Sequence, residues 1–456
     1  MRNRWRKGQR YSHRNHFVRG GVEFSPGCRT PQEPNVFKFI HAADIHLDSP
    51  LRGLSHYEGA PVDSIRGATR EALKGLVQTA IEEEVAFVII AGDLFDGDWK
   101  DYNTGLFFAG QMSKLRENDI QIFYLAGNHD ATSRITKSLK MPDNVHRFST
   151  SRPETITLKD IGVALHGQGF SRPDIRENLA VNYPPAKKGF YNIGVLHTGA
   201  TGREGHELYA PCKIQDLTSK AYDYWALGHI HKREILLETP LILFPGNIQG
   251  RHIRETGPKG CTLAAVGDDR STAIEEVPLD VVRWARVEID ATGLDSGEAV
   301  MFEVRSAIEK ALTDSDGRLL AVRVTITGAC GAHEDLNAEH DRWVNQIRVE
   351  ATDIGGNDVW IEKVVLKTNL QVDLEKLTSS DGPIGDLLKF INQIEINPIE
   401  LAELAETLSI LKSKLPLELR HGEDSIDLDS PERLREIIAD ARQVLLPYLM
   451  TKSLDP

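Results

Sequence analysis

The sequence predicts an α/β fold that is followed by a smaller α+β module and a helical tail. Three observations support this prediction. Apolar segments of strand length alternate with amphipathic helices in the first third of the chain, more short apolar segments follow without long helices between them, and the pattern becomes mixed α+β after Pro278. The length of 456 residues is typical of about three domains.

The first part of the predicted fold, residues 37–280, begins with alternating strands and helices. Strands are expected over 36–43, 87–91 and 121–126, and helices over 62–84 and 104–118. The short loops between these elements imply right-handed crossovers within one sheet. Further strands are expected near 155–158, 161–166, 191–197, 223–227 and 241–244. Because no long helices separate these later strands, they indicate a second, partly antiparallel sheet.

Two further regions follow the predicted double-sheet part. Residues 281–366 alternate strands over 284–290, 321–326 and 359–366 with helices over 297–313 and 334–349, which is typical of a compact α+β module. Residues 367–456 are acidic and predicted to be helical, with helix starts at Asn397-Pro398 and Ser430-Pro431. Leucines follow the first of these starts at steps of three and four residues, namely Leu401, Leu404, Leu408, Leu411 and Leu415.

Charge is distributed unevenly along the chain. The formal net charge is -13, yet residues 1–36 carry eight basic and two acidic residues. We expect this basic segment to be a disordered N-terminal extension, with a DNA-contacting arm as the alternative. The acidic remainder argues against nucleic-acid binding through bulk charge alone, so such binding would need a local patch or a bound cation.

Cysteine usage and hydropathy indicate the compartment. The four cysteines are far apart and form no CxxC pair, which excludes a disulfide framework and a thiolate zinc site and fits a reducing compartment. No apolar run reaches the roughly 20 residues that a membrane-spanning helix needs. We therefore expect a cytoplasmic protein without a membrane segment.

Five short polar segments each follow a predicted strand. They are Asp44-Ile-His46, Gly92-Asp93-Leu-Phe-Asp96, Gly127-Asn128-His129-Asp130, His197, and Gly228-His229-Ile-His231. The carboxyl ends of strands in open α/β sheets converge on one crevice, so these segments are expected to meet in space. Their donors are oxygen and nitrogen without a thiolate, a mixture that suits manganese, iron or zinc better than calcium or a single magnesium.

The donor set favours two divalent metal ions. Two metals about 3.5–4 Å apart are suited to phosphoester hydrolysis, because they polarise phosphoryl oxygens and lower the pKa of a bound water. A carboxylate can bridge two metals, whereas a histidine does so poorly. A single D-x-H or H-x-H motif is weak on its own, and His41, His56, His166 and His252 are interpreted as structural or exposed residues.

The ordered motifs resemble the calcineurin-like metallophosphoesterase superfamily. The finer resemblance is to the SbcD-like DNA repair exonuclease family, in its YhaO-type bacterial branch, through AADIHLDSPL at residues 42–51 and FPGNIQGRHIRETGPKG at residues 244–260. It covers residues 37–280 and is weaker beyond them. The resemblance implies a four-layer α/β/β/α sandwich with residues 281–366 as a DNA-selecting capping domain.

The resemblance also implies roles for individual residues. One metal would be held by Asp44, His46 and His231, and the other by Asn128, His197 and His229, with Asp93 bridging the two. His129 would be the acid or transition-state donor at the scissile phosphate. Asp130 would either orient His129 or cap the loop. Asp96 stands where archaeal and eukaryotic relatives have a histidine, which leaves the role of this position open.

Two regions outside the metal motifs are candidates for binding macromolecules. Arg251, Arg254 and Lys259 lie in a glycine-rich loop and are expected either to contact DNA phosphates or to form a solvated charged loop. In the resembling family the tail helices dock on an SMC-like ATPase with a long coiled coil. The alternative is that the leucine stripe packs on the protein's own body.

The sequence therefore predicts a manganese-dependent DNA exonuclease or endonuclease that acts in repair with an ATPase partner. The alternatives are another calcineurin-like phosphodiesterase acting on cyclic or small nucleotides, a protein phosphatase, and a scaffold that has lost its metals. The motif GNHD rather than GNHE disfavours the phosphatase, the 175 or so residues after the core disfavour the small-molecule enzyme, and the presence of all seven ligands disfavours the scaffold. Strand polarity, the native metal and homodimer formation stay open.

Overall fold

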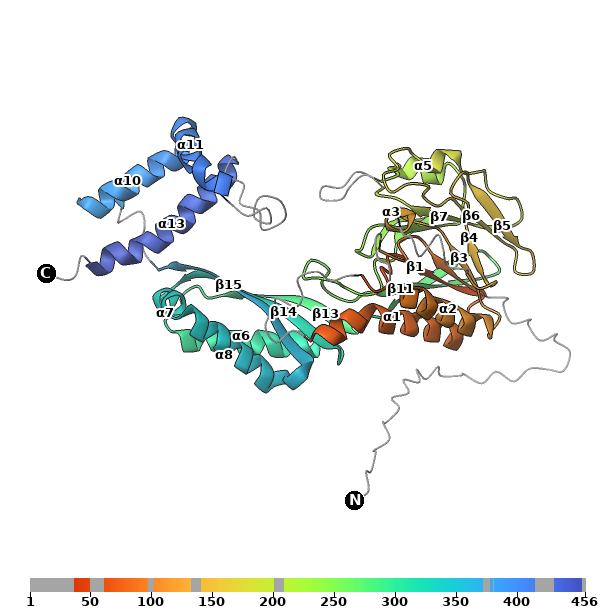
Figure 1. The fold of residues 1–456 in the computed structure, drawn as a ribbon, viewed down its shortest axis with the longest axis horizontal. Helices are drawn as coiled ribbons and strands as arrows, with labels where there is room; N and C mark the ends of the chain where they lie inside the picture. The colour runs from red at the N-terminus through yellow and green to blue at the C-terminus, as the bar shows by residue number, and fades with distance from the viewer. Residues whose placement is uncertain are drawn as a thin grey trace, which may run out of the picture.

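The structure is a computed structural model that describes residues 37–49, 61–96, 102–132, 141–200, 209–371, 378–379, 381–414 and 430–452. The predicted N-terminal extension, residues 1–36, lies outside these residues. Figure 1 shows a large two-sheet part, a smaller sheet with helices against it, and a group of C-terminal helices.

The first sheet contains six strands in the order β12-β11-β1-β2-β3-β4. Strands β1 to β4 are parallel and comprise Phe37–Ala42, Phe87–Ile90, Gln121–Tyr124 and Val145–Arg147. Strands β11 and β12, Gly260–Val266 and Thr272–Pro278, add an antiparallel edge. Helices α1 (Val62–Glu82) and α2 (Tyr102–Arg116) connect the first three strands, as the sequence predicts.

The second sheet also contains six strands, in the order β5-β6-β7-β8-β10-β9. Its strands are Glu154–Leu158, Val163–Gly167, Tyr191–His197, Tyr224–Gly228, Glu234–Glu238 and Leu241–Phe244 for β5 to β10. The four central strands are parallel and both edge strands are antiparallel. The expected second, partly antiparallel sheet is therefore confirmed.

Alternating side chains hold the layers together, as β2 illustrates. Val88 and Ile90 pack with α1 and α2, whereas Phe87 and Ile89 pack against the second sheet. A strand with both faces buried needs such a continuous apolar sequence. The outer face of the second sheet is covered by the short helices α5 (Ile214–Thr218) and η2 (Ala180–Asn182) and by loops. The expected four-layer α/β/β/α sandwich is observed, with loops forming much of its fourth layer.

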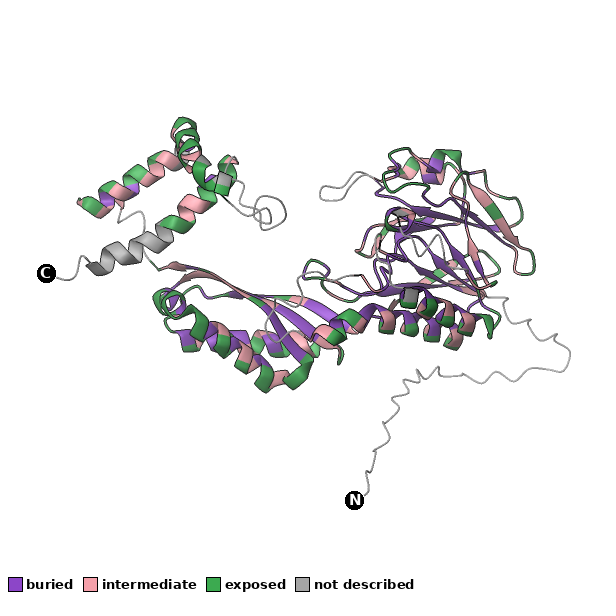
Figure 2. Cartoon of the chain, in the orientation of Figure 1, coloured by how far each residue is buried: buried purple, intermediate pink, exposed green. Residues whose placement is uncertain are grey.

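The α+β module contains the parallel sheet β13-β14-β15, which comprises Val282–Asp290, Leu319–Cys330 and Val359–Leu370. Helices α6 (Gly297–Thr313), α7 (His333–Ala338) and α8 (His340–Gly355) pack against it, and the buried residues between them form its core (Figure 2). The single helix predicted over 334–349 is two helices, because the backbone leaves the helical region at Glu339.

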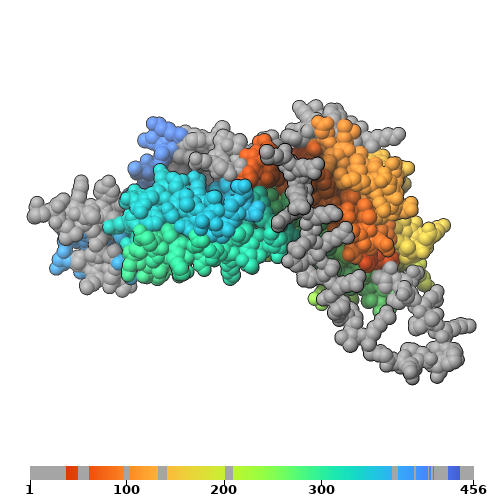
Figure 3. All heavy atoms as spheres, turned by 90° about the horizontal axis from the view of Figure 1, so that it is seen from below, coloured from red at the N-terminus to blue at the C-terminus, as the bar shows by residue number. Residues whose placement is uncertain are grey.

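The module and the two-sheet part share a small apolar cluster. Ile65 and Ala68 of α1 and Ile253 pack with Trp284 and Trp360 of the module, and the two indole rings meet edge to face with centroids 6.0 Å apart. In Figure 3 the module lies directly beside the first helices of the two-sheet part.

The tail contains helices α10 (Pro383–Ile396), α11 (Pro398–Lys414) and α13 (Pro431–Lys452). Asn397 starts α11 as predicted, because its side-chain oxygen accepts the amide of Ile399 at 3.0 Å. Leu401 and Leu434 are buried where these helices meet, and Leu408 packs against them. Part of the leucine stripe that begins at Leu401 therefore packs against other helices of the tail. Within the described residues, no helix is long and apolar enough to cross a membrane.

Candidate metal centre

The five polar segments meet at one edge of the double sheet. Asp44, Asp93 and Asn128 follow β1, β2 and β3 of the first sheet, while His197 ends β7 and His229 follows β8 of the second sheet. The backbone amide of Asp44 donates to the carbonyl of Gly92 at 3.0 Å, which joins the first two segments. The convergence predicted from strand ends is therefore present.

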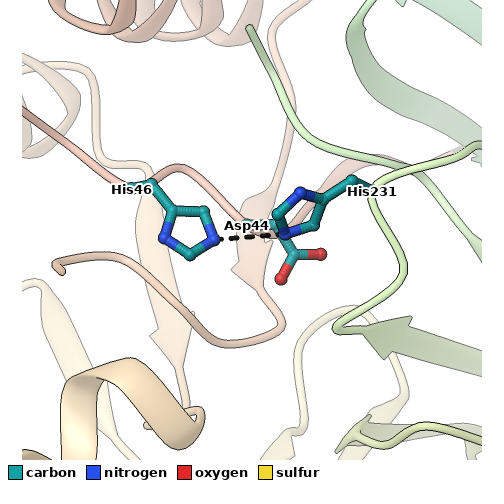
Figure 4. A group of neighbouring side chains, drawn as sticks. All are labelled: Asp44, His46 and His231. Carbon is teal, nitrogen blue, oxygen red and sulfur yellow. Dashed lines mark hydrogen bonds between the residues drawn. The ribbon is translucent and has the colours of Figure 1, made fainter. Parts of the chain in front are cut away.

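The first group of donors comprises Asp44, His46 and His231, whose ligand atoms lie within 4.8 Å of one another. Figure 4 shows the two imidazole rings turned toward each other above the carboxylate. The Nε2 atoms of His46 and His231 are 3.2 Å apart. The carboxylate of Asp44 accepts the amide of His229 at 3.0 and 3.1 Å, which fixes its orientation.

The second group comprises Asp93, His197 and His229, again with ligand atoms within 4.8 Å of one another. Nε2 of His197 lies 2.9 Å from Oδ1 of Asn128 and 3.4 Å from Oδ2 of Asp93. The same Asp93 oxygen lies 3.9 Å from Nε2 of His46 in the first group. Asp93 therefore reaches both groups, the position that a bridging ligand requires.

The backbone around these side chains is unusual. Asp44, His46, Asp93 and His229 all have positive φ, at 51°, 46°, 51° and 101°. Non-glycine residues rarely adopt this region, and such strain concentrates at functional sites. Gly127 lies so close to Asp93 that a Cβ there would be 2.2 Å from the carboxylate oxygen. A side chain at position 127 would displace the residue shared by both groups.

Burial and mutual charge perturb the acids and bases of the site. Burial raises the pKa of Asp44 to about 6 and lowers that of His46 to about 4. Burial also acts to raise the pKa of Asp93, but His197 and His46 outweigh it and hold that pKa below its usual range. In return Asp93 overcomes the effect of burial on His197 and raises its pKa to about 9.

The donor set fits two divalent cations. His46 and His231 each direct Nδ1 to a carboxylate, so their facing Nε2 atoms are both hydrogen-bond acceptors, and a cation satisfies such a pair. All seven predicted ligands are oxygen or nitrogen donors, which suits borderline divalent metals such as manganese or zinc. Six of these side chains form the two groups described above, and Asn128 lies beside the second group through its contact with His197.

A third group places His129 beside the metal donors. Oδ1 of Asp96 lies 2.7 Å from Nδ1 of His46 and 2.9 Å from Nδ1 of His129. Burial acts to lower the pKa of His129, but the hydrogen bond to Asp96 outweighs it and the net pKa is raised. The His129 side chain is 44% exposed, so a substrate can reach it.

Asp130 has the contacts of a loop-capping residue. Its buried carboxylate accepts the backbone amides of Leu94 (3.1 Å), Phe95 (2.9 Å) and Gly127 (3.0 Å). It therefore ties the second polar segment to the third. These contacts are those of the capping alternative, and the carboxylate of Asp96 contacts the His129 ring.

The three basic residues of the predicted DNA-contacting loop have different environments. Arg254 is exposed. The Arg251 side chain is only 16% exposed and points to Asp96, with a nitrogen–oxygen distance of 3.6 Å. Lys259 is buried, and its ammonium donates to the carbonyl of His231 at 3.1 Å. Lys259 is thus a structural residue here, because a buried, engaged ammonium cannot also contact a phosphate chain at the surface.

Glu255 lies within the 244–260 motif, but the sequence analysis gives it no role in the site. It is 6% exposed, and its Oε1 lies 2.6 Å from Nδ1 of His231. Burial acts to raise its pKa, but His231 and Arg251 outweigh this and hold it below the usual range. The proximity of Glu255 to the H-x-H segment depends on how the loop folds back, so only an acidic residue in the RHIRE run hinted at it.

The fold and this two-group site define a metal-dependent phosphoesterase of the calcineurin-like class. Residues 37–233 match the family described as calcineurin-like phosphoesterase, and residues 284–369 match the middle domain of the metallophosphoesterase YhaO. The chain is 35% identical over 413 residues to the uncharacterized metallophosphoesterase YhaO of Bacillus subtilis (strain 168), covering 89% of this chain and 96% of that protein. The chain belongs to the YhaO-type metallophosphoesterase family.

More distant similarity extends to archaeal proteins. The chain is 24% identical over 413 residues to the DNA double-strand break repair protein Mre11 of Methanopyrus kandleri, covering 80% of this chain and 85% of that protein. It is 26% identical over 303 residues to the protein of the same name from Sulfurisphaera tokodaii, covering 61% and 70%.

Proposed function

We propose that this phosphoesterase is a manganese-dependent DNA nuclease that hydrolyses phosphodiester bonds in DNA repair. The observation that carries the proposal is the junction at Asp93, which reaches both donor groups while His129 stands exposed beside them. Two-metal phosphoesterases place their reacting phosphate at such a junction. The similarity to proteins named for DNA double-strand break repair supports DNA as the substrate.

The proposed mechanism assigns each donor group one ion. Asp44, His46 and His231 would hold one, Asn128, His197 and His229 would hold the other, and Asp93 would contribute to both. When bound, the ions polarise the phosphoryl oxygens and lower the pKa of the nucleophilic water. The mixture of imidazole, amide and carboxylate donors favours manganese over calcium or magnesium.

The remaining chemistry belongs to side chains next to the donors. His129 gives a proton to the leaving sugar oxygen, since an alkoxide is a poor leaving group. Asp96 orients the His129 ring by accepting from Nδ1 at 2.9 Å. Asp130 keeps the loop that carries Asn128 and His129 fixed to the loop after β2.

DNA selection is assigned to surfaces outside the metal centre. The α+β module lies next to loop 250–260 through Ile253 and Trp284, a position suited to a capping domain that guides DNA. Arg254, which is exposed on this loop, is the proposed phosphate contact. The three cysteines within the described residues are buried and unpaired, which supports a reducing compartment such as the cytoplasm as the proposed location.

A substrate comparison tests the nuclease proposal. The metal-loaded protein should cleave linear duplex DNA with a kcat/KM at least about tenfold above that for cyclic dinucleotides, because binding energy from contacts remote from the reacting phosphate adds to catalysis on a long substrate. Phosphopeptides serve as the phosphatase control. Efficient cleavage of a cyclic dinucleotide or a phosphopeptide without cleavage of DNA would replace the nuclease by the corresponding alternative.

The tail is the proposed docking element for an SMC-like ATPase. Phe390 on α10 and Ile399 on α11 are 57% and 70% exposed, whereas the tail's own core is formed by Leu401 and Leu434. An apolar residue on a helix surface suits helix-in-groove or helix-on-coiled-coil packing.

Removing residues 371–456, which leaves β15 whole, should lower recovery of a co-expressed SMC-like ATPase in a pull-down by at least about tenfold, the equivalent of about 1.4 kcal/mol of lost binding. Phe390→Asp and Ile399→Asp should weaken recovery in the full-length chain, since neither residue is part of the tail core. Exposed Val181 in the two-sheet part provides the matched control Val181→Asp. Unchanged recovery after deletion would refute docking through the tail.

A further inference from the structure

The two histidines of the first donor group share an arrangement around Nδ1. Nδ1 of His46 lies 2.7 Å from Oδ1 of Asp96, and Nδ1 of His231 lies 2.6 Å from Oε1 of Glu255. Each imidazole therefore has a carboxylate on the nitrogen opposite to the one it offers as a ligand. This contact fixes both the tautomer and the direction of the ring.

The two carboxylates are themselves held in place. Arg251 extends between them, with nitrogen–oxygen distances of 3.6 Å to Asp96 and 3.7 Å to Glu255. The second oxygen of Glu255 accepts the Asn247 side chain at 2.9 Å and the Arg251 amide at 2.7 Å, and that of Asp96 accepts the hydroxyl of Ser49. Because the arginine offsets the charge of both carboxylates, the pair can remain ionised in a largely buried site.

The loop that carries Glu255 is anchored to the module. The indole nitrogen of Trp284 donates to the carbonyl of Gly250 at 3.0 Å, and the side chain of Gln249 donates to the carbonyl of Val282 at 2.6 Å. These bonds to β13 limit the movement of the loop. Glu255 is thus positioned by the module as well as by its own hydrogen bonds.

The second donor group has a different arrangement at His197. Nδ1 of His197 lies 3.0 Å from the backbone carbonyl of Ala91, a neutral acceptor. A carboxylate makes an imidazole a more basic ligand than a carbonyl does, and removing such partners lowers metal affinity about 10–100-fold in known sites. Both histidines of the first group therefore have a carboxylate at Nδ1, whereas His197 of the second group has a neutral carbonyl there.

We propose that Asp96 and Glu255, linked by Arg251, are positioning residues that make the group of Asp44, His46 and His231 the tighter of the two metal sites. The proposal rests on the two-metal centre proposed above. Asp96 and Glu255 are not ligands themselves and act through the histidines that they contact. The metals are therefore expected to bind in order, with the first group filling before the group of Asp93, His197 and His229.

The test is a manganese titration of the metal-free, full-length protein, followed by calorimetry. The wild type should bind two ions with distinguishable affinities. Asn128→Ala should remove or weaken the lower-affinity class only. In that background Glu255→Gln should lower the affinity of the remaining site about 10–100-fold, because the amide keeps a hydrogen-bond acceptor but loses the charge. Asp96→Asn should act on the same site.

Glu362→Gln is the matched control. Glu362 is also a buried carboxylate in a two-point contact with an arginine, Arg323, at 2.6 and 2.8 Å, but it lies in the module sheet. Its replacement should leave both manganese affinities within about twofold of wild type, as expected for a site with no shared partners. Circular dichroism on each variant separates a local effect from unfolding.

The possible results distinguish failure of the positioning role from failure of the two-metal centre. A wild type that binds no manganese, or only one ion, contradicts the two-metal centre itself. If two ions bind but Glu255→Gln and Asp96→Asn both leave the tighter site within about twofold of wild type, or weaken only the other site, the positioning role is wrong and the centre stands. An equal loss in Glu362→Gln also overturns the positioning role, because it would show a general effect of removing a buried charge.

Discussion

Replacing Asp93 by asparagine should lower kcat/KM for a chromogenic phosphodiester by at least about 10³-fold, which corresponds to about 4 kcal/mol of transition-state stabilisation. Asp93 reaches both donor groups, through Oδ2 at 3.4 Å from His197 and 3.9 Å from His46. Asparagine is nearly isosteric but neutral, so it cannot offset the charge of two cations. The measurements are steady-state hydrolysis at saturating manganese and the number of ions bound.

Asp223→Asn provides the control for this substitution. Asp223 accepts the amide of Asn192 at 2.7 Å in the second sheet, outside both donor groups, and its replacement should leave hydrolysis within about twofold of wild type, since distant sites act independently. If Asp93→Asn kept a tenth of the activity and bound two ions with wild-type affinity, Asp93 would not be the residue shared by the metals.

The sequence signal that predicts the meeting of the polar segments is local. Each ligand motif directly follows an apolar strand, as Asp44 follows β1 and Asp93 follows β2. A strand end fixes where the next residue lies, and the general geometry of α/β sheets then brings the ends together. His41, which is interpreted from the sequence as structural or exposed, is buried and bonded to Tyr224 and to the carbonyl of Leu227.

Features that depend on long-range pairing were not predicted. Strands β11 and β12 join β1 from the far end of the two-sheet part, with Phe37 opposite Val266, and no local pattern specifies that partner. Glu255 meets His231 only because loop 250–260 folds back onto the H-x-H segment. The prediction that Lys259 contacts DNA or solvent is wrong for the same reason, since its charge suggests exposure whereas the loop buries it.

The role of Asp96 follows from its contacts in the structure and not from the family resemblance. Asp96 is an acceptor between His46 and His129. Sequence alone left its role open, because the choice depends on which rings face it. The contacts connect Asp96 to both metal binding and proton transfer, so its substitution alone cannot separate the two functions.

His129→Ala separates them, and should lower kcat for DNA hydrolysis by about 10²–10⁴-fold, the usual contribution of a general acid. Manganese binding should be retained, because the contact from residue 129 to Asp93 is made by the backbone amide, at 3.0 Å, and survives the substitution. The matched control is His146→Ala, which removes another partly exposed imidazole paired with a carboxylate, Glu154 at 3.2 Å.

The choice of substrate then distinguishes acid catalysis from a structural role for His129. A nitrophenolate leaves without a proton, whereas the sugar oxygen of DNA needs one, so His129→Ala should lower hydrolysis of a nitrophenyl phosphodiester by less than about tenfold. A general acid is required only where the leaving group is basic. Equal losses on both substrates, or loss of manganese together with activity, would show that the ring of His129 supports the geometry of the centre and does not donate the proton.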